Sequence, residues 1–462
     1  MSPTRRDFLT GASALALWPA HQRAAKAGTG GVTLEAAPTP IQLAPPEFPK
    51  TTVWAYNRQV PGQTLRYTRG DTLDVRLHNN LPQDTTIHWH GLRLPNAMDG
   101  VPGLTQAPVT PGGSFDYRFA LRDAGTFWYH PHANSVEQIS RGLAGVLVVD
   151  EPKAERPDVD AEEVLVLDDW RMASDAVIRD DFGAWHDMSH AGRLGNYITV
   201  NAHPEMRRAA PSGGRLRLRL VNTATARIFD LRFRGLRVWL AALDAMPIET
   251  PTEVTEVTLA PAQRADLLVD VTAEAGEEAL IASVERDGTF ALAAFDVTGP
   301  ARATRPAPDP LPPNDMPQVD LNDARRVPLV MEGGAMRGLP DGGTWQGNKM
   351  DMRQLAEAGQ FWAFNGMVGM PDAPMIEAFE GETIRIPIDN RTAFAHAMHL
   401  HGMHFREVQD GGALGPWRDT LLVRAGETRE IAFVADNLGD WMFHCHMPSH
   451  QMSGMMNWIR VS

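Results

Sequence analysis

The sequence predicts an all-β fold made of three consecutive β-sandwiches. Short segments with apolar residues at every second position recur along the chain, as in 72–77, 215–221 and 383–388, and this period of two is typical of half-buried strands. No long segment has the apolar period of a helix, and only 353–359 suggests a short one. The 40 Gly and 35 Pro residues supply the turns that a chain of short strands requires.

Two proline-containing linkers divide the chain into pieces of sandwich size. The first, 151–160, is charged, and the second, 298–317, is dense in proline and should be extended. They predict separate sandwiches over residues 40–150, 161–298 and 318–462.

The first and third pieces open with similar sequences. YTRGDTLDV at 67–75 resembles FEGETIRI at 379–386, and each is followed by an asparagine and then by a histidine cluster. This similarity indicates an internal repeat.

The N-terminus resembles a twin-arginine export signal. Arg5-Arg6 precede an apolar stretch over 11–18, which is too short to cross a bilayer, and Ala25-Lys26-Ala27 offers a cleavage site. We therefore expect residues 1–27 to be a removable signal peptide and the mature protein to be periplasmic, with no membrane span.

Charge and cysteine content narrow the functional classes. The formal net charge of -14 argues against nucleic acid as a partner, because such proteins carry a basic patch. The single cysteine, Cys445, cannot form an intrachain disulfide. In an exported protein a lone thiol is either buried or bound to a metal, and the two histidines that flank Cys445 favour the metal.

Ten of the 16 histidines fall in four short segments. Neutral imidazole is the commonest protein ligand of transition metals, and four such clusters are hard to explain by packing. The segments are His88-Trp-His90, His130-Pro-His132, His396-Ala-Met-His399-Leu-His401 and His444-Cys-His446-Met-Pro-Ser-His450.

The alternation of side chains along a strand separates these residues into two sites. Residues two apart point to one face, and residues one or three apart point to opposite faces. His444 and His446 therefore share a face while Cys445 points the other way, and His396 lies opposite the other histidines of its segment. Cys445 and His396 can then meet at one site, and the paired histidines can converge on another.

The two sites predict different metal centres. Two imidazoles and one thiolate with a weak axial thioether are typical of a blue-copper site, whereas zinc usually takes other cysteine and histidine spacings. The ligands of this first site would be His396, Cys445, His450 and Met455. The second site would gather eight imidazoles, which is too many for one ion and requires several metals. These are His88, His90, His130, His132, His399, His401, His444 and His446.

The four segments resemble the copper-binding signatures of multicopper oxidases, in their usual order and placement. The resemblance covers essentially the whole mature chain, and its most specific part is the run from His444 to Met455. It implies a bacterial, laccase-like, twin-arginine exported member with three consecutive cupredoxin-like Greek-key β-sandwiches. The first and last sandwiches would carry copper ligands.

The resemblance also implies ligands for four copper ions. The type 1 copper would take His396, Cys445, His450 and Met455, and the type 2 copper would take His88 and His399. The type 3 pair would take His90, His130, His132, His401, His444 and His446. Strand alternation alone separates the two sites but does not assign individual coppers within the larger one.

The implied activity couples four one-electron oxidations of a reducing substrate to the reduction of O2 to two waters. Cys445 is joined through the chain to His444 and His446, so the electron path between the sites is a few bonds of one strand. Asp99 matches the position of an acid that helps to deliver protons in this family. The residue after His450 is Gln451, where the family often has a glutamate, so Asp99 is the expected proton donor.

Two classes of electron donor stay open. We expect a monomeric, laccase-like enzyme that oxidises phenols, and the alternative is a periplasmic metallo-oxidase acting on Cu(I) or Mn(II). Seven methionines lie between residues 331 and 375, in surroundings typical of a loop, and soft thioethers select Cu(I) although methionine also fills core gaps. The middle piece has no histidine cluster, and we expect His186, His190 and His203 to be surface residues.

The rival from another class is a copper-free structural protein. Some periplasmic cell-division proteins share the three-sandwich fold but lack the ligands, whereas this chain has all of them. Copper nitrite reductases resemble the type 1 site but have two domains and lack the full set of histidine pairs.

Overall fold

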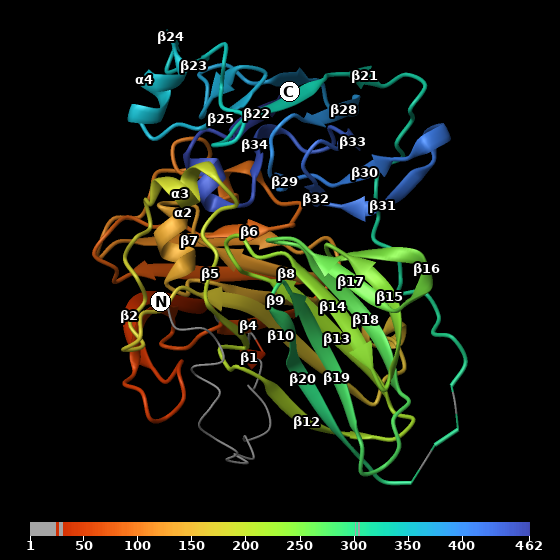
Figure 1. Cartoon of the computed structure of the whole chain (residues 1–462). Helices are drawn as coiled ribbons and strands as arrows, with labels where there is room; N and C mark the ends of the chain where they lie inside the picture. The colour runs from red at the N-terminus through yellow and green to blue at the C-terminus, as the bar shows by residue number, and fades with distance from the viewer. Residues whose placement is uncertain (1–24, 27–30, 301, 304) are drawn as a thin grey trace.

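The alternating segments form the strands of three two-layer β-sandwiches (Figure 1). The computed structural model describes residues 25–26, 31–300, 302–303 and 305–462. The sandwiches follow one another along the chain, so the predicted all-β class is confirmed. The predicted signal peptide lies outside the described residues, except for Ala25–Lys26, which form strand β1.

The first sandwich contains two sheets. One has the strand order β1, β4 (Gly62–Thr68), β9 (Gly145–Asp150), β8 (Gly125–His130) and β6 (His88–His90). The other has the order β3 (Thr51–Tyr56), β2 (Val32–Ile41), β5 (Thr72–Asn79) and β7 (Ser114–Ala120). Three short helical segments accompany them: η1 (Asn96–Met98), α2 (Ser135–Ser140) and η2 (Lys153–Glu155).

The second sandwich also has two sheets and one short helix, α3 (Trp185–Ser189). The first sheet has the order β11 (Tyr197–Val200), β10 (Ala161–Trp170), β13 (Arg215–Asn222), β18 (Arg264–Val271), β15 (Leu236–Leu243) and β16 (Met246–Val254). The second has the order β12 (Met206–Pro211), β20 (Gly288–Thr298), β19 (Glu278–Glu285), β14 (Phe229–Arg234) and β17 (Glu256–Leu259).

The third sandwich carries a larger sheet. Its order is β24 (Asn348–Met350), β23 (Gly343–Trp345), β26 (Met367–Val368), β25 (Trp362–Phe364), β22 (Leu329–Gly333), β28 (Thr383–Asn390), β33 (Thr428–Val434), β30 (Phe405–Val408) and β31 (Leu414–Arg418), and β21 (Arg325–Arg326) also pairs with β28. The second sheet has the order β27 (Ile376–Ala378), β35 (Met456–Val461), β34 (Gly439–Cys445), β29 (His396–Leu400) and β32 (Thr420–Val423). Its helices are α4 (Met352–Glu357), η3 (Asp410–Gly412) and α5 (Pro448–Met452), and α4 overlaps the segment 353–359 that was expected to be helical.

The same strand pairing recurs in all three sandwiches. β5 lies antiparallel to β7 and parallel to β2. β13 has the same relation to β18 and β10, and β28 has it to β33 and β22. The repeat expected between the first and third pieces is therefore present in the topology and extends to the second.

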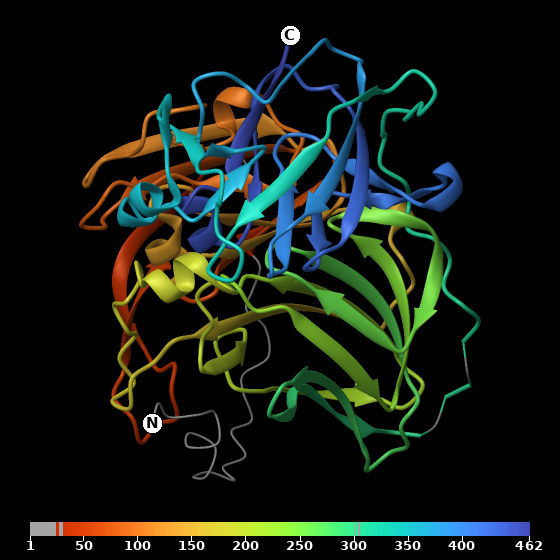
Figure 2. The ribbon, with the colours of Figure 1, turned by 45° about the horizontal axis from the view of Figure 1, so that its top comes forward.

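The sandwiches surround a common centre, so that each one borders the other two (Figures 1 and 2). The apolar cores of the first and third sandwiches merge into one continuous cluster, which includes Trp89, Tyr129, Phe443 and Met455. The second sandwich has a separate core. A functional site between the first and third sandwiches can therefore be excluded from water.

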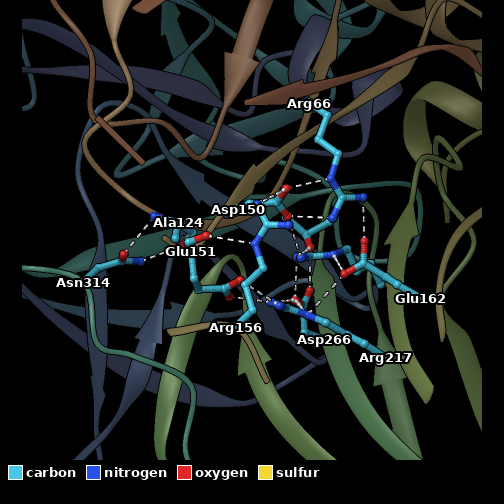
Figure 3. A network of polar contacts seen from close by, with 11 residues as sticks. Arg66, Ala124, Asp150, Glu151, Arg156, Glu162, Arg217, Asp266 and Asn314 are labelled. Carbon is cyan, nitrogen blue, oxygen red and sulfur yellow. Dashed lines mark hydrogen bonds and ion pairs between the residues drawn. The ribbon is translucent and has the colours of Figure 1, made fainter. Parts of the chain in front are cut away.

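Strand β13 corrects the expectation of half-buried strands. Its alternate arginines Arg215, Arg217 and Arg219 are only 7%, 2% and 0% exposed. Burial is tolerated because the guanidinium groups are ion-paired. Arg217 forks to Glu151 at 2.9 and 2.8 Å and also binds Asp266 at 2.7 Å (Figure 3).

The linker predicted over 298–317 has no helix or strand between residues 305 and 317 but is anchored to the first sandwich. The Asn314 side chain exchanges two hydrogen bonds of 2.9 Å with the backbone of Ala124 (Figure 3). Arg93 donates to the backbone oxygen of Asp315 at 2.6 Å. No helix in the described part of the chain is long and apolar enough to cross a membrane.

Candidate metal centre

Two pairs of antiparallel strands present the paired histidines. In the first sandwich β6 pairs with β8, so that His88 lies opposite His130. In the third sandwich β29 pairs with β34, so that His399 lies opposite His444. Each of these histidines has another histidine two residues further along: His90, His132, His401 and His446.

The two sets of histidines meet across the boundary between the first and third sandwiches. The His90 ring stacks on that of His399 with centroids 3.7 Å apart. Nε2 of His446 lies 3.2 Å from Nε2 of His130. The structure thus brings together all eight imidazoles expected at the larger site, and none is more than 7% exposed.

Several ring nitrogens in this cluster are buried without a hydrogen-bond partner. A buried polar atom left unpaired costs about 1–3 kcal/mol, so such atoms indicate a missing ligand. The unpaired atoms are Nε2 of His88, His132 and His399 and Nδ1 of His90. Nε2 of His401 lies 3.0 Å from Nε2 of His444, a close approach that a shared metal ion would explain.

In several of these rings the opposite nitrogen donates to an oxygen, which fixes the tautomer. Nδ1–H of His88 donates to the backbone oxygen of Asp99 at 2.8 Å. Nδ1–H of His401 donates to Oδ2 of the same residue at 2.9 Å. Asp99 is 1% exposed. It therefore forms a buried link between one histidine of the first sandwich and one of the third.

Burial favours the neutral form of three imidazoles in the larger cluster. Burial, together with repulsion between neighbouring rings, holds the pKa values of His130, His132 and His444 well below the usual value. A metal requires the neutral form of imidazole, and the fixed tautomers leave lone pairs directed into the cluster. The residues present therefore fit transition-metal ions.

A smaller cluster lies on the opposite face of the same strands. Nδ1 of His396 and Nδ1 of His450 lie 3.6 and 3.7 Å from Sγ of Cys445 and 3.0 Å from each other. All three side chains are fully buried. Strand alternation predicted this separation from the larger cluster.

Burial raises the pKa of the Cys445 thiol to about 12 and lowers that of His450 to about 4. A metal ion that binds here must displace the thiol proton but finds the imidazole already neutral. Met455 is also buried, and its backbone N–H donates to His450 at 3.0 Å while its carbonyl accepts from Cys445 at 3.1 Å.

Helix α3 of the second sandwich covers the smaller cluster. This contact was not predicted from the sequence. Nε2–H of His450 donates to the backbone oxygen of His190 at 2.6 Å, and Nε2 of His396 lies 2.8 Å from Oγ1 of Thr392. His186 is exposed, as expected, whereas His190 and His203 are half-buried. His190 acts through its backbone, which no side-chain spacing can reveal.

Sequence reasoning also missed Asp419. This fully buried carboxylate accepts from Nε2–H of His90 at 3.1 Å, and its backbone oxygen accepts from Nδ1–H of His399 at 2.9 Å. It belongs to no histidine segment and lies between β31 and β32, so its sequence neighbours gave no signal.

The methionines between 331 and 375 do not form one loop. Met331 lies in β22 and is fully buried, which corrects the expectation for that residue. Met336 and Met352 are 72% and 52% exposed. The backbone N–H of Ala335, next to Met336, donates to the backbone oxygen of Ser189 of α3 at 2.8 Å, which holds the loop that carries Met336 against α3.

Comparisons with known proteins agree with this geometry. Three family models described as multicopper oxidase match residues 39–154, 162–299 and 345–462. The multicopper oxidase MmcO of Mycobacterium tuberculosis is 31% identical over 457 residues, which cover 92% of this chain and 85% of that protein. Copper resistance protein A of Pseudomonas syringae pv. tomato is 26% identical, with 99% of each chain covered.

Solved structures show the same relationship. A multi-copper oxidase from Pseudomonas thermotolerans has a TM-score of 0.80 and 34% identity, with 94% of this chain and 100% of that chain covered. Lac15 from a marine microbial metagenome has a TM-score of 0.76 and 37% identity, with the same coverage. With family models along most of its length, cupredoxin-like sandwiches and two buried clusters of metal-binding side chains, the chain belongs to the multicopper oxidase family.

Proposed function

We propose that this protein is a laccase-like oxidase that couples four one-electron oxidations of phenols to the reduction of O2 to two waters. The observation that carries the proposal is the connection between the two clusters. Cys445 lies in the smaller cluster, and its chain neighbours His444 and His446 lie in the larger one. Electrons accepted at one site thus have a short covalent path to the other.

The proposal assigns four copper ions to these side chains. His396, Cys445, His450 and Met455 would hold the type 1 copper, and His88 and His399 the type 2 copper. The type 3 pair would be held by His90, His130, His132, His401, His444 and His446. The unpaired ring nitrogens support this assignment and argue against a copper-free structural role, because without metal they would be buried at a cost.

The coppers, when bound, would supply one-electron storage and O2 reduction, and the protein would supply positioning and protons. The two antiparallel strand pairs hold the ring nitrogens at fixed separations. Asp99 contacts His88 and His401 and is the acid best placed to hold a proton beside the larger cluster. Gln451 is buried, and its amide Nε2 lies 3.9 Å from Sδ of Met442. A glutamine amide does not titrate near neutral pH, so this side chain cannot itself donate protons.

A metallo-oxidase acting on Cu(I) or Mn(II) is the second candidate. The exposed thioethers of Met336 and Met352 favour Cu(I), and the relatives named copper resistance protein A support a role in copper tolerance. The cover of α3 over His450 also keeps bulky donors away from that imidazole.

Oxygen uptake by the copper-loaded protein separates these donors. We expect a methoxyphenol to give the highest kcat/KM of three donors, the other two being Cu(I) and Mn(II). A kcat/KM for Cu(I) that exceeds the phenol value would make the protein a metallo-oxidase and would contradict the laccase-like proposal.

We also propose the domain bounds, the cellular location and the oligomeric state of the enzyme. The domains would span 40–150, 161–298 and 318–462, and the strand pairing and the three family matches support this division. Twin-arginine export of a monomer to the periplasm rests on the sequence of residues 1–27.

A further inference from the structure

A buried arginine of the second sandwich contacts the larger metal cluster through one carboxylate. Arg264 begins β18 and is fully buried. Its guanidinium forks onto Asp419, with Nη1 2.9 Å from Oδ1 and Nη2 2.6 Å from Oδ2. A bidentate pair of this kind fixes the carboxylate in position and in orientation.

Asp419 in turn fixes two histidines from different sandwiches. Its Oδ1 accepts from Nε2–H of His90 at 3.1 Å, and its backbone oxygen accepts from Nδ1–H of His399 at 2.9 Å. These bonds leave Nδ1 of His90 and Nε2 of His399 as the unpaired nitrogens that face the cluster. His90 therefore presents a different ring nitrogen from His399, and the bond to Asp419 explains why.

The surroundings leave no alternative place for the arginine. Its Nε donates to the backbone oxygen of Thr126 at 3.2 Å, and its backbone N–H donates to Asp244 at 3.0 Å. Gly91, the residue after His90, has a φ of +85°, and a Cβ there would collide with the guanidinium of Arg264. All three sandwiches thus close around this one ion pair.

We propose that Arg264 is a positioning residue for the multinuclear copper site, because its fork holds Asp419 where that residue selects the copper-binding nitrogens of His90 and His399. The inference rests on the proposed function. It gives the second sandwich, which has no copper ligand, a direct part in assembling the site.

Charge supports the same role. The guanidinium fork of Arg264 supplies the counter-charge that the buried carboxylate of Asp419 requires. An ionised carboxylate only accepts hydrogen bonds, so it requires a proton on Nε2 of His90. Loss of Arg264 would leave that carboxylate buried without its cation.

The test compares copper retention in Arg264→Met with that in Arg215→Met. Arg215 is a matched control, because it also forks onto a buried aspartate, Asp270, at 2.6 and 2.9 Å. Asp270 lies near the end of β18 that is opposite Arg264, so the control disturbs the same sheet without touching Asp419. Copper-loaded proteins are dialysed against a graded chelator, and the type 2 EPR signal and the blue absorption of the type 1 copper are followed.

We expect Arg264→Met to lose type 2 copper at about 10–100-fold lower chelator concentration than the wild type, as is typical for loss of a ligand-orienting partner, while the blue absorption stays. Arg215→Met should match the wild type in both signals. Arg264→Lys keeps the charge but not the fork, and we expect an intermediate loss of type 2 copper. If Arg264→Met does not fold, Arg264→Lys decides the question. The quantity compared is again the chelator concentration at which type 2 copper is lost, relative to the wild type.

Three outcomes would overturn the inference. Arg264 variants that retain type 2 copper as the wild type does would show that the fork is dispensable. Equal loss of both copper signals, or equal effects of Arg264→Met and Arg215→Met, would show a general role in stability. Failure of the wild-type protein to bind copper at all would instead remove the proposed function itself, together with this inference.

Discussion

Cys445 is the residue on which the proposed electron transfer would depend. Its thiolate would be the strongest donor to the type 1 copper, and the backbone on either side leads to His444 and His446. Serine is nearly isosteric but is a poor copper ligand at neutral pH. We expect Cys445→Ser to lose the blue absorption and the oxidation of every donor together, as measured by visible spectroscopy and oxygen uptake.

The fold of that variant should survive, because the three sandwich cores do not depend on one thiol. Far-UV circular dichroism and type 2 EPR serve as controls and should match the wild type. A Cys445→Ser protein that stays blue would disprove the type 1 assignment.

Variants of Asp99 and Gln451 test how protons reach the larger cluster. Asp99 contacts one histidine from the first sandwich and one from the third, whereas Gln451 touches Met442 and cannot titrate near neutral pH. We expect Asp99→Asn to slow reoxidation of the reduced enzyme by O2 about 10²-fold or more, a loss typical of removing a general acid. Stopped-flow measurements between about pH 5 and 8 would show it.

Gln451→Glu is the matched gain-of-acid variant. The blue absorption should hardly change, and reoxidation should become faster or persist to higher pH. If both variants reoxidise like the wild type, protons reach the cluster by a path that includes neither residue.

At the scale of elements, α3 and the loop beside it cover the smaller cluster, where we propose the type 1 copper. The carbonyl of His190 caps Nε2 of His450, and the backbone of Ala335 holds the Met336 loop against Ser189. If exposed thioethers bind Cu(I), the double variant Met336→Ser/Met352→Ser should lower kcat/KM for Cu(I) at least about tenfold, since soft sulfur ligands select this ion. The rate with a methoxyphenol should be kept.

Steady-state oxygen uptake with both donors makes this comparison. Equal loss for the two donors would indicate that the methionines are structural. Met331 is unsuitable for this test, because it is buried in β22 and its removal would leave a cavity.

At the scale of the whole molecule, buried ion pairs join the first and second sandwiches. Arg217 binds Glu151 and Asp266, and all three are nearly inaccessible to solvent (Figure 3). Removal of one partner from such a network leaves unpaired buried charges. We expect Arg217→Met to lower the free energy of unfolding by about 3–5 kcal/mol, as measured by urea denaturation of the copper-loaded protein.

Acid should weaken the boundary between the first and second sandwiches. Burial raises the pKa of Asp266, but Arg219 and Arg217 outweigh burial and hold the pKa below its usual value. A carboxyl with a lowered folded-state pKa stabilises the protein above its unfolded pKa of about 3.9, and this stabilisation disappears as the pH falls further. Denaturation midpoints should therefore drop below about pH 4, and they should drop less in Arg217→Met if this network is the cause.

The sequence predicted the sandwiches and the two clusters because both follow from a period of two. Alternation placed Cys445 opposite His444 and His446, and it located β5 and β28. Residues that act between sandwiches escaped prediction. Arg264 and Asp419 lie 155 positions apart and meet only in the folded chain.

Other differences also have physical reasons. The alternate arginines of β13 have the pattern of a solvent-facing edge, but they are buried in ion pairs with residues of β18 and of the first sandwich. Met331 stands among glycines and polar residues, yet it pairs with β25 and packs into the core. The local sequence pattern predicts which residues of a strand share a face. It does not predict which other parts of the chain cover that face.

The two joined copper sites that we propose would reduce O2 completely to water. The most direct test measures the stoichiometry of the copper-loaded enzyme with a methoxyphenol in an oxygen electrode, with catalase added at the end. We expect about four phenols oxidised for each O2 consumed and no return of oxygen on adding catalase, because four coppers would deliver four electrons. Consumption of one O2 for about two phenols, with oxygen returned by catalase, would show release of peroxide and would contradict this expectation.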